Sequence, residues 1–151
     1  MATKNNVINI DLSSTSKKKV IFDNDEDRAV YLDLADMSIT TRLSAVEPKL
    51  NELSEKFGKV KDGESSMSEI SETLSEIDKE MRDLIDYLFD APVSAVAAPS
   101  GSMFDMFNGE FRCSIIMSAL LEQYTANVEK ETAILDKQMR KHTDKYTKGT
   151  K

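Results

Sequence analysis

The sequence predicts a mainly helical α+β protein with a small N-terminal antiparallel β element, a helical hairpin and a long C-terminal helix. Three observations lead to this prediction. Short runs of β-branched and aromatic residues occur before residue 35, two heptad-spaced apolar stripes follow, and a further helical pattern comes after a proline-containing segment. With 151 residues, 40% of them apolar, the chain is long enough to bury a core of its own.

The β element is expected within residues 1–35. Apolar runs at 7–12, 20–22 and 29–34 predict three short strands, and the acidic segment 23–27 predicts the turn between the last two. The three consecutive lysines at 17–19 are expected on an exposed edge strand, where positive charge discourages association with another edge.

The hairpin is expected within residues 36–90, and its first helix begins near Asp36, a suitable N-cap. Pro48 lies inside this pattern and predicts a kink or a restart around 44–48, because proline removes a helical hydrogen bond. Gly58 and Gly63 bracket the expected turn after the helix. The apolar stripe consists of Ile39, Leu43, Val46, Leu50, Leu53, Phe57 and Val60.

A capping box, Ser66 followed by Glu69, predicts the start of the second helix of the hairpin. Each of the two stripes is about three heptads long and is apolar on one side only. We therefore expect them to face each other in an antiparallel hairpin. The second stripe consists of Met67, Ile70, Leu74, Ile77, Met81, Leu84 and Leu88.

Residues 91–102 separate the two halves of the chain. They hold two of the three prolines and mostly small side chains, which predicts a flexible or extended connector rather than a helix. The last part, 103–151, contains an aromatic segment with an Asn108-Gly109 turn.

A long helix is expected from about residue 110 to 146. Beyond Val128 its stripe thins, so the last turns are expected to project from the core as a solvated helix. The apolar positions are Ile115, Met117, Leu121, Tyr124, Val128, Leu135 and Met139.

The sequence carries no enzyme signature. Cys113 and His142 are the only cysteine and the only histidine, which excludes an internal disulfide, zinc-finger spacing and most Cys–His or Ser–His–Asp catalysis. The glycines form no phosphate-binding loop. We therefore expect no enzyme and no catalytic residue, metal or cofactor. Cys113 is interpreted as a small core residue and His142 as a solvated surface residue.

Two groups of carboxylates are candidate sites. The alternating acids Asp23, Asp25 and Asp27 resemble the start of a calcium loop, but Arg28 stands where the loop needs glycine and Leu34 where it needs a bidentate glutamate. A solvated turn is the prediction. The paired acids of the second helix are interpreted as a solvated helix face. They are Glu76 with Glu80 and Asp83 with Asp86.

The net charge of −7 is unevenly distributed. Residues 47–90 contain 13 acidic and six basic residues, whereas 137–151 contain six basic residues and one acidic residue. The basic tail can therefore attract the acidic middle of its own chain or of a second copy, which makes a homo-oligomer possible. Nucleic acid is expected at most as a weak contact of the tail.

The chain shows neither a signal-peptide core nor an apolar stretch of membrane-spanning length, so a cytoplasmic location without membrane contact is expected.

The segment 103–111, MFDMFNGEF, has the most unusual local composition. It has two interpretations: the segment folds back to cap the hairpin, or it forms a docking surface for an apolar partner through large phenylalanine and adaptable methionine side chains. The candidate partner-binding residues are Met103, Phe104, Met106, Phe107 and Phe111.

The order of these segments resembles the tail assembly chaperones of long-tailed phages. The resemblance rests on INIDL and KKKVIF at the N-terminus, AVYLDLADMSITTRL leading into a helix, LIDYLFD ending an acidic helix, and FDMFNGEF before a final helix. It covers residues 7–130 and leaves out the basic tail. It implies a protein of the host cytoplasm that binds the tape-measure protein, keeps its long apolar helices soluble and helps tail-tube subunits assemble. The alternative is a phage virion or scaffold protein that acts through helical self-association.

Overall fold

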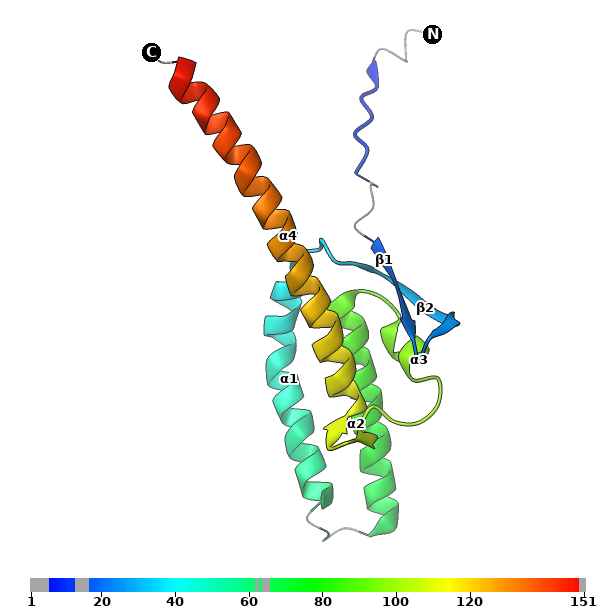
Figure 1. The fold of residues 1–151 in the computed structure, drawn as a ribbon. Coiled ribbons are helices and arrows are strands. Elements are labelled where there is room, and N and C mark those ends of the chain that lie inside the picture. The colour runs from blue at the N-terminus through cyan, green and yellow to red at the C-terminus, as the bar shows by residue number, and fades with distance from the viewer. Residues whose placement is uncertain (1–5, 13–16, 62, 64–65, 150–151) are drawn as a thin grey trace.

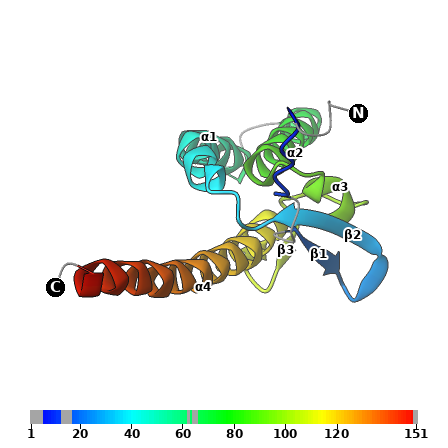
Figure 2. The ribbon, with the colours of Figure 1, turned by 90° about the horizontal axis from the view of Figure 1, so that it is seen from above.

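The computed structural model describes residues 6–12, 17–61, 63 and 66–149 (Figure 1). It has the predicted class, a mainly helical α+β fold. Helices α1 and α2 form a hairpin, α4 packs beside them and continues past their far end, and the small sheet lies to one side (Figures 1 and 2). The elements are β1 (Lys17–Phe22), β2 (Asp25–Asp33), α1 (Ser38–Lys61), α2 (Met67–Phe89), α3 (Val93–Ala97), β3 (Met106–Phe107), β4 (Glu110–Phe111) and α4 (Arg112–Gly149).

The N-terminal β element is a single antiparallel hairpin. Asp23 and Asn24 form its two-residue turn with φ of 55° and 58°, the left-handed conformation that tight hairpins require. The turn therefore forms within the predicted segment 23–27 but is shorter than predicted, because Asp25 already begins β2. The predicted strand over 7–12 is wrong: the segment forms no strand, and its apolar side chains are 71–88% exposed. A run with strand propensity still needs a partner strand, and the lysines 17–19 on β1 discourage one.

Helix α1 begins as predicted, close to Asp36. The Asp36 carboxylate accepts a hydrogen bond from the backbone N–H of Ser38 at 2.9 Å and thereby satisfies a donor that the helix itself cannot pair. The helix is continuous through Pro48, so the predicted restart does not occur. Pro48 and Ser44 are exposed, while the intervening Val46 is buried in the seam and maintains the packing.

Helix α2 begins with the predicted cap, because the Ser66 hydroxyl accepts a hydrogen bond from the backbone N–H of Glu69 at 3.3 Å. The two stripes face each other as expected, and Arg42 Nε donates to the Leu88 carbonyl at 2.9 Å near the far end of the hairpin. The buried side chains of the seam are Ile39, Val46 and Leu53 from α1, and Ile77, Met81, Leu84 and Leu88 from α2.

Residues 91–102 were expected to be a connector without helix, and this prediction is wrong over 93–97, which form α3. Four residues of the segment are buried: Val93, Ser94, Ala97 and Ala98. The prolines limit the length of a helix here, but alanine favours one, so the residues between Pro92 and Pro99 can form a short helix. Their small side chains allow the backbone to pack closely against α2 and β2.

Arginines fasten this segment by binding its carbonyl groups. Arg82 of α2 donates to the carbonyls of Ala98 and Gly101, both at 3.0 Å. Arg28 of β2 donates to the Ala97 carbonyl at 2.6 Å. These contacts satisfy backbone acceptors that no secondary structure pairs.

The carboxylates of α2 are only partly the solvated face that was expected. Asp86 accepts hydrogen bonds from the backbone N–H and the hydroxyl of Ser94, both at 2.8 Å. Asp86 therefore holds α3 in place, and the prediction of a solvated carboxylate is wrong for this residue. Glu76 and Asp83 are exposed, as expected.

Helix α4 packs through a face shifted from the predicted one. Cys113, Ile116, Leu120 and Tyr124 are buried, whereas Ile115 is 40% exposed. The burial of Cys113 confirms its interpretation as a core residue. Every described side chain from 129 to 143 is exposed, including His142, so the projecting solvated helix is confirmed (Figure 1).

Candidate docking groove

Three phenylalanine rings from separate parts of the chain pack together beside the closed end of the hairpin. Phe57 of α1 stacks on Phe104 with ring centroids 5.7 Å apart, and Phe111 of β4 meets both rings edge-on at 4.9 and 5.5 Å. Offset and edge-to-face pairs are favourable because the positive ring edge meets the negative ring face. This cluster anchors the aromatic segment against the hairpin.

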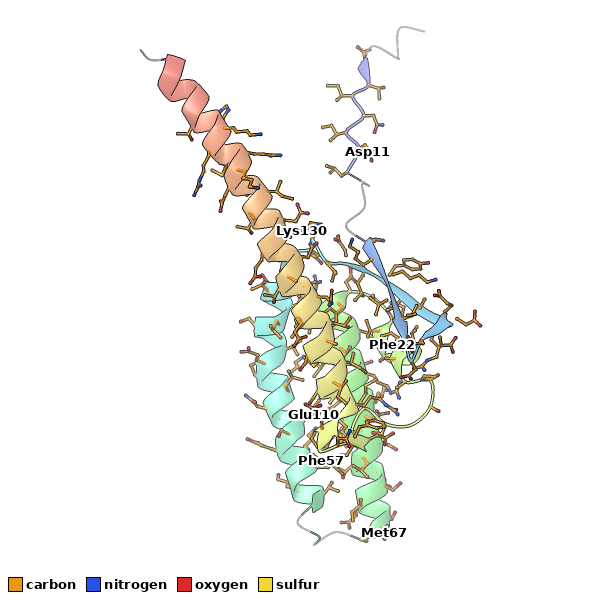
Figure 3. All side chains as sticks on the ribbon, viewed as in Figure 1. Asp11, Phe22, Phe57, Met67, Glu110 and Lys130 are labelled. Atoms are coloured by element: carbon orange, nitrogen blue, oxygen red, sulfur yellow. The ribbon has the colours of Figure 1, made fainter. Side chains whose placement is uncertain are left out.

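Two rings of the cluster, Phe57 and Phe104, line an open apolar groove of about 650 Å³. Two methionines at the groove are strongly exposed, Met67 at 80% and Met106 at 66%. Phe57 and Met67 lie at the same end of the molecule in Figure 3. The apolar side chains that line the groove are Phe57, Val60, Met67, Ile70, Leu74, Phe104 and Met106, and polar groups that include Ser71, Asp78 and Asp105 complete it.

The loop that carries Phe104 is fixed to α2 by Asp78. Its carboxylate accepts a hydrogen bond from the backbone N–H of Met103 at 2.7 Å and one from Arg82 Nε at 3.0 Å. On the other side of the loop, the Asp105 carboxylate accepts from the backbone N–H of Ser102 at 3.1 Å. The loop that carries Phe104 forms one wall of the groove, which we call the loop wall. It is therefore held by hydrogen bonds to charged side chains as well as by apolar contacts.

The structure divides the five predicted partner-binding residues. Met103 and Phe104 are 0% and 8% exposed and belong to the core, Phe111 is half-buried in the ring cluster, and Met106 and Phe107 are exposed. The Asn108-Gly109 turn forms as predicted, with φ of 52° and 82°. The segment thus caps the hairpin and still presents part of its surface.

Met106 and Phe107 line different hollows, because adjacent strand residues point to opposite sides. Met106 lines the groove, whereas Phe107 lines a second hollow of about 410 Å³. There the Arg112 guanidinium lies 5.2 Å from the centre of the Phe107 ring, a cation–π contact. Arg112 also donates to the Ser100 carbonyl at 3.0 Å, so it is already engaged by the protein.

Five groove residues were missed as partner-binding candidates: Phe57, Val60, Met67, Ile70 and Leu74. The sequence placed them in the stripes and therefore in the seam. The signal that would have found them is the length of the stripes, which continue to the closed end of the hairpin (Figure 1). At that end Phe57, Val60 and Ile70 are only partly buried. Met67, the first position of its stripe, is the most exposed of them.

Cys113 does not line the groove. Cys113 is buried, and burial raises the pKa of its thiol, which disfavours the nucleophilic thiolate. In the part of the chain that the structure describes, no three His, Cys, Asp or Glu side chains gather in a way that could hold a metal ion. What the groove offers is an adaptable apolar surface beside acidic residues.

Comparisons with known protein families, with curated proteins and with solved structures found no match to this chain. None of the helices in the described residues combines the length and the apolar character needed to cross a membrane.

Proposed function

We propose that this protein is a phage tail assembly chaperone that holds an amphipathic helix of the tape-measure protein in the groove beside Phe57, Met67 and Met106. The observation that supports the proposal is the pair of exposed methionines next to a phenylalanine cluster. Methionine is flexible and polarisable, so it adapts to the varied apolar side chains of a long helical client. The resemblance of the segment order to tail assembly chaperones supplies the identity of the client.

The charge of the groove region favours a client with basic residues beside its apolar face. The two carboxylates of the groove, Asp78 and Asp105, are already paired with arginines. The exposed residues Glu69, Glu72 and Glu76 lie on the same half of α2 and supply the negative charge. Like charge across an interface is costly, so acidic helices are disfavoured. Release of the client to the growing tail tube requires only reversible binding, which suits an open groove without deep pockets.

The proposal is tested with the double variant Met67→Ser/Met106→Ser. Both side chains are mostly exposed, so the melting temperature should remain close to that of the wild type. Binding to a peptide from the amphipathic region of the candidate tape-measure protein, measured by calorimetry, should weaken at least about tenfold, which corresponds to about 1.4 kcal/mol.

Met139→Ser is the matched control, because Met139 is 60% exposed but lies on the far part of α4. It should bind the peptide like the wild type. The proposal fails if the wild-type protein does not bind the peptide, or if the double variant binds it with unchanged affinity.

A virion or scaffold protein is the second candidate, and the projecting end of α4 favours it, since such a helix suits self-association. The two candidates differ in whether the protein is part of the mature phage particle. A chaperone is absent from purified particles, whereas a virion component is found there in stoichiometric amounts.

A further inference from the structure

The far part of α4 leaves the body of the protein as a single helix. We call residues 129–143 the distal helix; Lys130 in Figure 3 marks where it begins. Every side chain in this range is exposed, and three of them are large and apolar: Ile134 at 43%, Leu135 at 54% and Met139 at 60%. This apolar surface does not depend on the groove or on its proposed client.

A lone helix of this length is only marginally stable in water, because most helical stability in proteins comes from packing an apolar face. Over residues 129–141 the distal helix also lacks support from internal ion pairs. Between Glu129 and Lys141, none of its charged side chains forms an ion pair within the described part of the chain. The charges of residues 129–141 and the apolar side chains Leu135 and Met139 are therefore available to a partner.

The spacing of the apolar side chains defines one seam. Thr132, Leu135 and Met139 continue from Val128, which packs partly against the core, at intervals of four, three and four residues. This is the pattern of a helix that packs against another helix. Ile134 lies outside this series. The seam is therefore narrow, as in a two-helix contact, rather than broad, as in a helix lying on a flat surface.

The charge of the helix changes sign along its length. Residues 129–136 contain three acidic residues and one basic residue, whereas 138–145 contain three basic residues and one acidic residue besides His142. Two such helices in antiparallel orientation place the acidic half of each beside the basic half of the other. In parallel orientation the two basic halves would repel each other.

We propose that the distal helices of two copies of this chain pair antiparallel around a two-fold axis near Lys137. In this arrangement Leu135 of one copy faces Met139 of the other, and Thr132 faces His142. The contact is isologous, because the same surface serves both partners, so it closes as a dimer. It is charge-assisted and weakens as salt concentration rises.

Light scattering over a concentration series tests the dimer. The wild type should change from monomer to dimer as concentration rises, and Leu135→Asp should shift the dissociation constant at least about tenfold towards monomer, because a charge in the seam is costly. Ile134→Asp, the same change one residue away and outside the seam, is the matched control and should dimerise nearly like the wild type.

Cysteine cross-linking tests the orientation. A mixture of Thr132→Cys and His142→Cys proteins should form a mixed disulfide dimer under mild oxidation. Thr132→Cys alone should not, because its two copies lie about 15 Å apart along the axis at a rise of 1.5 Å per residue. The native Cys113 is buried and does not interfere.

The pairing and the proposed function fail separately. Leu135→Asp should still bind the tape-measure peptide, and Met67→Ser/Met106→Ser should still dimerise. A wild type that remains monomeric at all concentrations, a Leu135→Asp variant that dimerises normally, or efficient cross-linking of Thr132→Cys to itself would each overturn the pairing. If the wild type is monomeric and Leu135→Asp no longer binds the tape-measure peptide, the seam is a binding surface for the client and not for a second copy.

Discussion

The carboxylate of Asp78 lies 2.7 Å from the backbone nitrogen of Met103, 25 residues further along the chain, and accepts its hydrogen bond. Met103 is fully buried, so this bond satisfies a donor that water does not reach easily. The bond joins the middle of α2 to the start of the aromatic segment. The loop wall of the groove therefore depends on a charged residue of the hairpin.

We expect Asp78→Ala to lower the free energy of unfolding by about 2 kcal/mol, because it leaves the N–H of Met103 and a charged hydrogen bond of Arg82 without their acceptor. Urea denaturation measures the change. Asp83→Ala, at an exposed position of the same helix, should change it by less than about 0.5 kcal/mol. Equal effects of the two substitutions would contradict the role of Asp78.

The aromatic segment should show a sharp contrast between two of its phenylalanines. Phe104→Ala removes a buried ring from the three-ring cluster and should lower the free energy of unfolding by about 3–5 kcal/mol. Phe107→Ala removes a ring that is 44% exposed and should cost about 1 kcal/mol. Thermal denaturation of both variants would refute the assignment if Phe107→Ala were the more destabilised.

A side chain at Gly101 should be costly, because it would displace the charged ends of Asp105 and Arg112 from their hydrogen bonds to the backbone. The φ of Gly101 is 85°, and a Cβ would lie 2.6 Å from Asp105 Oδ2 and 2.7 Å from Arg112 Nη1. Gly101→Ala should therefore be more destabilising than Gly109→Ala, which has a similar φ of 82° but open space around it. We expect about 1 kcal/mol for Gly109→Ala from backbone strain and about 2–3 kcal/mol for Gly101→Ala. A chemical melt in which the two variants coincide would show that the contact relaxes without cost.

The start of α1 should make stability depend on pH. A hydrogen bond from Arg42 lowers the pKa of Asp36 below its ordinary value of 3.8, and the bond from the N–H of Ser38 adds to this. A lowered pKa contributes stability that is present above the ordinary value and is lost as the pH falls through the folded-state pKa. Asp36→Asn should cost about 0.5 kcal/mol at pH 7, since the amide oxygen can still cap the helix.

The difference between wild type and Asp36→Asn should disappear as the pH falls below the folded-state pKa of Asp36. Denaturant titrations at a series of pH values measure it. A difference that stays constant down to low pH would mean that the ion pair with Arg42 does not contribute.

The sequence by itself determined the elements whose cause is local. The facing of the α1 and α2 stripes, the Ser66 cap, the Asn108-Gly109 turn and the solvated end of α4 were predicted correctly. In each case the periodicity or the turn residues of a short window carry the physical reason. The first turn was predicted in the right place but too long, and the seam was predicted to reach further towards the closed end of the hairpin than it does.

The tertiary structure alone decided what depends on distant partners. The small residues of 91–102 form α3 because Asp86, Arg28 and Arg82 supply hydrogen-bond partners from elsewhere in the chain, and residues 7–12 are no strand because no edge pairs with them. The same holds for the candidate site. Composition singled out 103–111, but whether Phe104 is core and Met67 is surface depends on where the covering elements end, and no local window contains that information.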